Sequence, residues 1–500
     1  MKKAVWLLAG VVCATAGAPA FGVPCANLSV LPIKNGTITS ADVVAAGAFA
    51  PAQGRGPVTA YRKLPPFCRI SGTLRPAADS HVGIEVWMPE TGWNGKLQSV
   101  GNGAWAGSIS YPAMATALAA GYATASTDTG HTGNSGRFVL EHPEEATDFA
   151  YRAVHEMTVA AKALIAAFYA SGPKYSYWNG CSTGGRQALV EAQRYPGDYD
   201  GIIAGAPANY VTHLQGMQVW AAQQAHRSEA SLIPAAKLAA LHRAALAACD
   251  AHDGVTDGVI EDPRECRFDP KVLACKNGDG PNCLTQPQLE TAAKLYAGPT
   301  DPRTGAQLFP GLEPGSETGW AMVAGPQPMS LAVEVYQYLV HQDPAWDYRS
   351  FDPAKDVALA DQKIAKTWDS TDPNLRPFFA HGGKLLMYHG WADPGIPPLN
   401  SVAYYTSVVK NVGADGGADS IRLFMVPGMG HCRGGDGTDT FDPVQALDEW
   451  VGSGRPPDHI PASRVRNGAS DRTRPLCPYP QTAHYQGTGS TDEAANFSCK

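Results

Sequence analysis

The sequence has no excess of basic residues and no Cys-x-x-Cys pair. Its 39 lysines and arginines are outnumbered by 46 aspartates and glutamates, which gives a formal net charge of −7. The basic footprint of a nucleic-acid-binding protein is therefore missing, and we expect no nucleic-acid partner. The lack of a Cys-x-x-Cys pair argues against a zinc ribbon.

Long hydrophobic runs are also scarce. Beyond the N-terminus, no uninterrupted apolar stretch reaches about 18 residues, so we expect a soluble mature protein without a membrane partner. The N-terminus itself has Lys2 and Lys3, an apolar stretch over residues 4–16 and the cleavage-like Ala18-Pro19-Ala20. This pattern predicts a secretory signal over residues 1–22, with an anchoring helix as the alternative. We therefore expect a secreted or periplasmic protein.

The remaining composition is that of a folded globular chain. Hydrophobic residues make up 44% of the sequence and charged residues 17%. A length of 500 residues suggests one large domain with an insertion, or two domains. The 53 glycines and 40 prolines indicate that much of the chain forms loops.

Strand-like and helix-like segments alternate over much of the chain. Strand patterns near residues 81–89, 96–103 and 123–130 alternate with helical ones, including a long amphipathic helix over 146–170. Such alternation predicts an α/β fold with a mostly parallel sheet covered on both faces. The rhythm stops after Pro207 and returns at Lys384. We therefore expect a catalytic core formed by residues 23–207 and 373–500, with an inserted lid domain over 208–372.

The stretch "YWNGCSTGGRQALVEAQRYP" contains a Gly-x-Ser-x-Gly pattern centred on Ser182. A strand-like segment precedes this pattern and a helix-like segment follows it, which is the context of a nucleophile elbow. The elbow is a sharp turn that projects the serine hydroxyl above the sheet. The alternative is a glycine-rich turn without catalytic function.

A serine needs a base and an acid to become a nucleophile. In this fold the order along the chain is serine, acid, histidine, each placed just after a strand. "KLLMYHGWADPGIPP" supplies Asp393 and "IRLFMVPGMGHCRGG" supplies His431. His389 is a rival base, but it precedes the acid. For the oxyanion hole we expect the backbone N–H groups of Thr183, and of Gly103 in "VGNGAWAG".

The eleven cysteines predict disulfides. Cys13 lies in the signal, and the remaining ten, an even number in an exported chain, suggest five bridges whose pairing the sequence alone does not fix. Cys181 precedes the proposed nucleophile and Cys432 follows the proposed base. A bridge between these two cysteines would hold both loops in the geometry that catalysis requires, whereas two unrelated buried thiols would not.

With these residues in place, the chain resembles the tannase and feruloyl esterase family of α/β-hydrolases. The matching stretches are "GCSTGGRQALVEAQRYPGDYDGIIAGAPA", "YHGWADPGIPP", "VPGMGHCRGG" and "RTRPLCPYPQ", together with "FPGLEPGSETGW" and "DPAWDYRSFDP" in the lid. The resemblance implies a Ser182–Asp393–His431 triad and hydrolysis of esters of aromatic acids, with the lid shaping the acid pocket. It also implies five disulfides: Cys25–Cys68, Cys181–Cys432, Cys249–Cys266, Cys275–Cys283 and Cys477–Cys499.

The loop "CDAHDGVTDGVIEDPREC" has the composition of a calcium site. Carboxylates on a glycine-bent loop suit Ca²⁺, although the spacing departs from the EF-hand pattern. The alternative is a solvated acidic turn. The family resemblance implies a structural calcium ion in the lid. The expected ligands are the carboxylates of Asp250, Asp253 and Asp257 and the backbone carbonyls of Val255 and Val259.

The substrate is less well defined by the sequence. Lid aromatics could stack on an aromatic acyl group, and among them we expect Trp320 to line the pocket. Feruloyl-type and galloyl-type esters fit the family. A hydrolase of mono(2-hydroxyethyl) terephthalate resembles it too. A terephthalate monoester favours a nearby arginine, and residues 321–348 contain no lysine or arginine, although a cation could come from elsewhere, such as Arg349. The sequence does not separate these two substrate classes.

Two further functions share these features. One is a non-catalytic, calcium-dependent binding protein on a hydrolase scaffold, which would not react with a serine-directed fluorophosphonate. The other is a serine peptidase, which casein digestion would reveal. We expect an esterase acting on a small-molecule aromatic ester, because the triad is complete and the family resemblance extends over nearly the whole mature chain.

Overall fold

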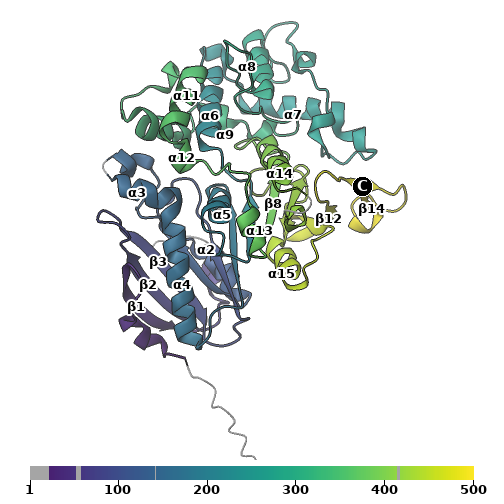
Figure 1. Cartoon of the computed structure of the whole chain (residues 1–500). Helices are drawn as coiled ribbons and strands as arrows, with labels where there is room; N and C mark the ends of the chain where they lie inside the picture. Colours follow the sequence, from purple (N-terminus) through teal and green to yellow (C-terminus); the bar gives the residue numbers. More distant parts are fainter. Residues whose placement is uncertain (1–21, 52–57, 141, 414–416) are drawn as a thin grey trace, which may run out of the picture.

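The computed structural model describes residues 22–51, 58–140, 142–413 and 417–500. The predicted signal, apart from Gly22, lies outside the described residues. One nine-stranded sheet forms the centre of the molecule, in the order β1-β2-β3-β5-β4-β6-β7-β8-β9 (Figure 1). The strands are β1 (Gly36–Val44), β2 (Phe67–Leu74), β3 (Val82–Pro89), β4 (Lys96–Val100), β5 (Ala123–Thr127), β6 (Tyr175–Cys181), β7 (Gly201–Gly205), β8 (Lys384–Gly390) and β9 (Ile421–Val426).

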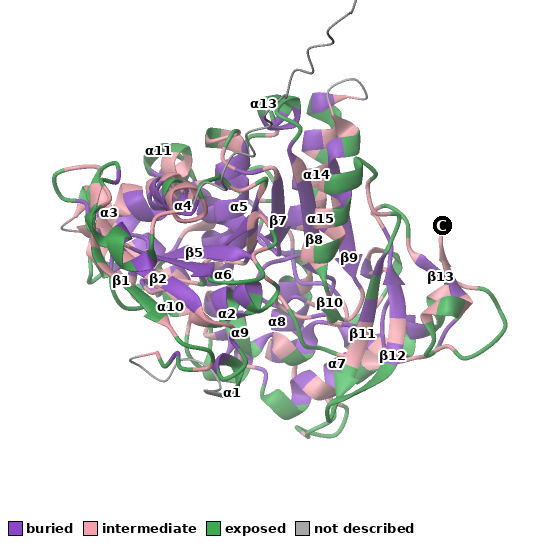
Figure 2. Ribbon diagram, turned by 90° about the horizontal axis from the view of Figure 1, so that it is seen from below, coloured by how far each residue is buried: buried purple, intermediate pink, exposed green. Residues whose placement is uncertain are grey.

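The sheet is antiparallel at one edge and parallel in the rest. β1, β2, β3 and β5 pair antiparallel in that order, whereas β5, β4, β6, β7, β8 and β9 run parallel. Parallel strands need crossover connections, which place helices on both faces and bury the strands. The fully buried "GIIAG" of β7 illustrates this, and Figure 2 shows the central strands as buried.

Helices cover both faces of the sheet. One apolar cluster joins α4 (Ala153–Tyr169), α5 (Thr183–Arg194) and α14 (Leu399–Val412) to one face, through Leu164, Leu189 and Val408. On the other face, α15 (Pro443–Ser453) contributes Leu447 and Trp450 to a cluster with β8 and β9. Three shorter helices also belong to the part of the chain before the lid: α1 (Val58–Tyr61), α2 (Tyr111–Ala119) and α3 (Pro143–Thr147).

The long helix expected over 146–170 is interrupted at its start. Asp148–Arg152 forms a π-helical segment between α3 and α4. Single π turns inside helices are often found at functional sites. This one turns Phe149 toward the cavity described below.

Between β7 and β8 the chain forms helices and adds no strand to the sheet; all of residues 206–383 are described (Figure 1). These helices lie over one end of the sheet and have their own apolar clusters. The lid boundaries at 208 and 372 remain a prediction. The helices are α6 (Val211–Ala225), α7 (Ala235–Cys249), α8 (Gln286–Ala297), α9 (Ala321–Ala324), α10 (Ser330–Glu334), α11 (Pro353–Lys363), α12 (Ala365–Trp368) and α13 (Arg376–Ala380).

One lid segment, Glu229–Asp253, has the length and composition of a membrane span, with a mean hydropathy of 1.3. Pro234 separates its first turn from α7, and Leu238 and Leu241 of α7 belong to the apolar core of the lid. Its hydrophobic character is therefore accounted for by packing within the lid.

The C-terminal residues form two small sheets beside the core. They comprise β10 (Thr440–Phe441), β11 (Ile460–Arg466), β12 (Ala469–Leu476), β13 (Ala483–Tyr485) and β14 (Phe497–Cys499). The structure confirms all five disulfides, with the pairing that the family resemblance implied: Cys25–Cys68, Cys181–Cys432, Cys249–Cys266, Cys275–Cys283 and Cys477–Cys499.

Candidate active site

Ser182 occupies the turn between β6 and α5. Its backbone has φ 63° and ψ −121°, a conformation that non-glycine residues rarely adopt. The surrounding hydrogen bonds hold it there: Ser182 N–H donates to the carbonyl of Gly205 at 3.0 Å, and its own carbonyl accepts from Ala208 N–H at 3.1 Å. The sharp turn expected from the sequence is present.

The flanking glycines are required by close backbone approach. A Cβ on Gly180 would lie 2.5 Å from the carbonyl carbon of Gly184, and one on Gly101 would lie 2.6 Å from Gly184 Cα. Three backbone segments therefore meet under the serine, and a side chain at any of these positions would push them apart.

Asp393 and His431 follow adjacent strands, β8 and β9. Asp393 is fully buried, and its Oδ2 lies 2.7 Å from His431 Nδ1. Its Oδ1 accepts the backbone N–H groups of Gly395 at 2.8 Å and Ile396 at 3.0 Å. The carboxylate is therefore fixed on both oxygens and oriented toward the histidine ring.

His389, the rival base, supports the acid. Its ring is fully buried, with Nε2 3.1 Å from Asp393 Oδ2 and 3.0 Å from the carbonyl of Ile396. Two acceptors facing Nε2 assign the proton to that nitrogen, so Nδ1 accepts from the Ser401 hydroxyl at 2.7 Å. The geometry thus gives His431, not His389, the place on the cavity wall.

These contacts shift the pKa values of Asp393 and His431. Burial by itself would raise the pKa of Asp393, but the charge of His431 and hydrogen bonds from both histidines outweigh it and lower the pKa. Burial alone would lower the pKa of His431, but the Asp393 charge and hydrogen bond reverse this and raise it. Asp393 is therefore ionised at neutral pH.

A cavity of about 500 Å³ lies between the core and the lid, and Ser182 and His431 both line it. The Cys181–Cys432 disulfide joins the residue before the serine to the residue after the histidine, with the two Cα atoms 6.1 Å apart. The serine loop and the histidine loop, 251 residues apart between these cysteines, are thus held together at one cavity.

The two expected oxyanion-hole residues also line this cavity. Thr183 is the first residue of α5, where a backbone N–H has no acceptor within the helix. Gly103 lies on the facing loop, and Thr183 Oγ1 donates to the carbonyl of Ala104 at 3.1 Å. This bond connects the two loops that carry the expected donors.

Comparison with known proteins identifies the family of the chain. The family model described as tannase and feruloyl esterase matches residues 68–500. An esterase of Xanthomonas campestris pv. campestris is 40% identical, over 98% of this chain and 93% of its own. The chain belongs to the tannase and feruloyl esterase family. It is a carboxylic ester hydrolase with the α/β-hydrolase fold.

Two further relatives extend the match. A probable feruloyl esterase B-2 of Neosartorya fischeri is 33% identical, over 86% of both chains. The solved structure of feruloyl esterase B from Aspergillus oryzae has a TM-score of 0.88 and 30% identity, covering 95% of this chain and 99% of its own. The match therefore includes the lid as well as the core.

The cavity wall of this tannase-family chain contains residues that the sequence did not single out. An aromatic group comes from three distant segments: the Trp105 ring centroid lies 5.0 Å from that of Phe149 and 5.7 Å from that of Trp368. One face of α6 supplies Val211, Leu214, Gln215 and Gln218. The helical spacing of these four residues, with two amides in an apolar stripe, is a signal that could have indicated them.

The expectation that Trp320 lines the pocket is wrong. Trp320 is 1% exposed and belongs to the apolar core of the lid. Its Nε1 donates to Ser316 Oγ at 2.9 Å, and its ring packs edge-on against Tyr296 at 4.8 Å between centroids. Met322, two residues further on, lines the cavity instead.

The proposed calcium loop is held by its own hydrogen bonds. The Asp250 carboxylate accepts the N–H groups of Asp257 at 3.1 Å and Gly258 at 2.9 Å, and Asp253 Oδ1 accepts Val255 N–H at 3.0 Å. Burial raises the pKa of Asp253, and the charges of Asp257 and Asp250 raise it further. Carboxylate oxygens are the type of ligand that Ca²⁺ prefers, and the calcium site in this loop stays a prediction.

The C-terminal sheet also contacts this loop. Asp257 pairs with Arg474 at 2.6 Å and with Arg472 at 3.2 Å, so its charge is already neutralised. Val255 and Val259 have buried side chains. The five-ligand set remains a prediction.

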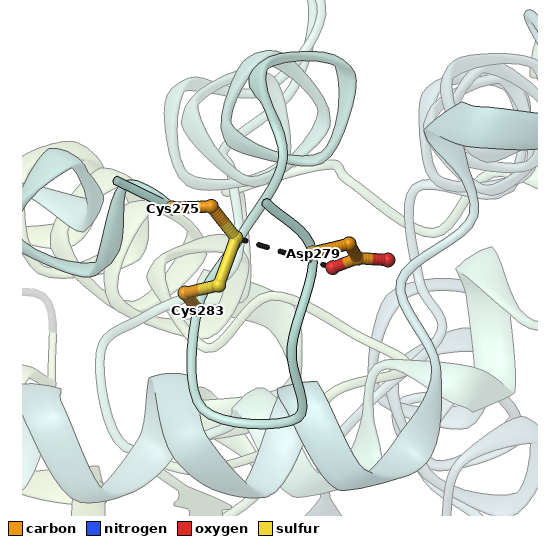
Figure 3. Close-up of side chains that lie close together, drawn as sticks. All are labelled: Cys275, Asp279 and Cys283. Carbon is orange, nitrogen blue, oxygen red and sulfur yellow. Dashed lines mark hydrogen bonds between the residues drawn. A yellow bond between two sulfur atoms is a disulfide. The ribbon is translucent and has the colours of Figure 1, made fainter. Parts of the chain in front are cut away.

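A different group of potential ligand atoms lies closer together. Within the described part of the chain, Cys275, Asp279 and Cys283 have such atoms within 4.8 Å of one another (Figure 3). The two sulfurs are joined in a disulfide, and Asp279 pairs with Lys237. A disulfide offers no thiolate to a metal ion, so we interpret this cluster as a disulfide that closes the loop and not as a metal site.

Proposed function

We propose that this family member is a secreted serine esterase that hydrolyses esters of aromatic acids, of hydroxycinnamic or gallic type, through an acyl-enzyme on Ser182. The observation that carries the proposal is the shared cavity: Ser182 lies on a strained turn there, with the Asp393-bound His431 on the same wall. A serine in a strained backbone conformation between a strand and a helix is typical of a nucleophile elbow.

The roles follow from this geometry. Asp393 accepts a hydrogen bond from the Nδ1–H of His431, which leaves Nε2 as the basic nitrogen. Nε2 takes the Ser182 proton while Oγ attacks the ester carbonyl. The N–H groups of Thr183 and Gly103 stabilise the resulting oxyanion. Collapse of the tetrahedral intermediate expels the alcohol, which receives the proton from His431. Water then attacks the acyl-enzyme while Nε2 of His431 takes its proton, and the acid leaves as the proton returns to Ser182.

The substrate class follows from the relatives and the cavity wall. Relatives of this chain are named feruloyl esterase, and the wall contains Trp105, Phe149 and Trp368. Aromatic rings pack favourably on one another at such spacing. These observations favour an aromatic acyl group in the cavity.

Export and calcium complete the proposal. Five disulfides suit an oxidising compartment, secreted or periplasmic. We propose that the Cys249–Cys266 loop binds one structural Ca²⁺ through Asp250, Asp253, Asp257 and the carbonyls of Val255 and Val259. Since the ion would bind only the folded loop, EDTA should lower the melting temperature and added Ca²⁺ should restore it. An identical melting curve with and without chelator would remove the claim.

The nucleophile assignment is tested with Ser182→Ala. We expect hydrolysis of methyl ferulate and methyl gallate to fall by more than about 1,000-fold, with no change in melting temperature, because the hydroxyl that forms the acyl-enzyme is missing. A fluorophosphonate should label the wild type and not the variant. Turnover retained in the variant would refute the assignment, and an unlabelled wild type would favour a non-catalytic binding protein.

A further inference from the structure

The cavity wall has hydrogen-bonding atoms without a partner in the protein. Among the described residues, buried atoms of this kind include Trp105 Nε1, Gln215 Oε1 and Gln218 Oε1. All three residues line the cavity, and each is at most 3% exposed. Buried polar groups are nearly always paired, so unpaired atoms in three residues around one cavity point to a ligand that pairs with them.

The orientation of Gln218 is fixed by its other amide atom. Its Nε2 donates to the carbonyl of Gly395 at 2.8 Å, and Gly395 N–H in turn donates to Asp393. The Nε2 contact assigns Oε1 as the free acceptor. Gln215 lies three residues earlier on the same helix face, so the two amides are neighbours. Two acceptors therefore stand together on a wall connected to the loop of the catalytic acid.

Two carbonyl oxygens require a hydrogen-bond donor. A phenolic O–H supplies one, whereas the ring carboxylate of a terephthalate monoester offers only acceptors at neutral pH. Trp105 Nε1 is a donor and requires an acceptor, which a ring oxygen provides. An aromatic ring that bears a hydroxyl group thus offers both kinds of partner, a donor for the amide oxygens and an acceptor for Trp105 Nε1.

We propose that Gln215 and Gln218 select acyl groups with a phenolic hydroxyl by accepting its O–H, while Trp105 Nε1 donates to an oxygen on the same ring. The proposal rests on the proposed function, because it assigns the acyl group to this cavity. A site built to bind a hydroxyl discriminates strongly against analogues that lack it, because its buried polar groups are then left unpaired.

The test compares kcat/KM for methyl 4-hydroxycinnamate with that for methyl 4-methoxycinnamate, which keeps the ring oxygen and lacks the O–H. We expect the wild type to prefer the hydroxylated ester by about tenfold or more. Gln215→Leu and Gln218→Leu should reduce this preference to about threefold or less. Mono(2-hydroxyethyl) terephthalate should be turned over less well than the hydroxylated ester by the wild type.

Gln224→Leu is the matched control on the same helix. Its side chain lies outside the cavity, where Oε1 accepts from Lys294 Nζ at 2.8 Å. This variant should keep the wild-type preference. Gln218→Leu also removes the donor to Gly395, so its kcat can fall for every ester, and the ratio of the two esters is the deciding measurement.

The outcomes separate the two proposals. A wild-type ratio near one, or an unchanged ratio in both cavity variants, overturns the role of the glutamines and leaves the esterase intact if Ser182→Ala abolishes turnover. A wild type that prefers the terephthalate monoester also overturns it. A wild type inactive on every aromatic ester overturns the proposed function and this inference with it. The wild-type ratio needs no variant, so a misfolded variant cannot obscure the result.

Discussion

Removal of the Cys181–Cys432 bridge should reduce the catalytic rate of the folded protein as well as its stability. The perturbation is the double variant Cys181→Ala/Cys432→Ala. The bridge closes a separation of 251 residues, for which the chain-entropy model gives a stabilisation of about 5.5 kcal/mol. A loss of that size lowers the melting temperature, so the assay is run at low temperature with calcium present.

Catalysis should suffer separately, because the bridge positions the nucleophile against its base. A displacement of about 1 Å costs on the order of 100-fold in rate, and we expect kcat/KM of the folded variant to fall by at least that factor. The assay is methyl ferulate hydrolysis at a temperature where circular dichroism shows native structure. The rate is normalised to the concentration of folded protein from the same circular dichroism measurement.

The control is Cys275→Ala/Cys283→Ala in the lid. This bridge closes only 8 residues and corresponds to about 2.5 kcal/mol in the same model. It lies outside the cavity lining, so kcat/KM should stay within about twofold of wild type while the melting temperature falls. A folded Cys181/Cys432 variant that keeps kcat/KM within about threefold would refute the positioning argument.

Two other predictions concern the histidines. His389→Leu should lower kcat about tenfold with little change in KM, because Asp393 loses a donor while the cavity is untouched, and His389→Gln should recover part of the loss; equal kcat in all three proteins would contradict this. Because His431 must be neutral to act as a base and its pKa is raised, kcat/KM should fall on the acid side with an apparent pKa above about 6.5. The same shift stabilises the fold below the ordinary histidine pKa and is lost as pH rises through the raised one, so activity and this stabilisation change in opposite directions. An acid limb below pH 6 in the rate profile would contradict the assignment.

The parts of the candidate site that the sequence indicated and the structure brings together at one cavity are local or carry a second marker. The elbow at Ser182 is specified within a few residues by strand, glycine and helix signals. The proximity of Ser182 to His431 is marked by Cys181, directly before the serine, and Cys432, directly after the histidine. Both cysteines are visible in the sequence although the two loops are far apart along the chain. The strand character of residues 81–89 followed from their pattern, but the antiparallel pairing of β2 with β3 did not, because the sequence alone predicted only a mostly parallel sheet.

The cavity wall could not be predicted in the same way. Trp105, Phe149 and Trp368 come from three segments and meet only through tertiary packing. A tryptophan that fills a core and one that lines a cavity look alike in a sequence, which is why Trp320 was misplaced. The π-helical turn at Phe149 is equally invisible, because it differs from the surrounding helix by one hydrogen-bond register.

Arg186 explains how this wall is held in register with the nucleophile. It lies one helical turn after Ser182 and is 2% exposed, and its guanidinium donates to the carbonyls of Ala150 at 2.8 Å, Phe149 at 3.0 Å and Trp368 at 3.3 Å. Burial lowers its pKa to about 10, so it remains charged at neutral pH. A lysine would offer its three donors from a single nitrogen, whereas the planar guanidinium spreads its donors over a fixed fork that here contacts the carbonyls from two nitrogens. The same helix that begins at the nucleophile therefore fixes the aromatic wall against which the acyl group would lie.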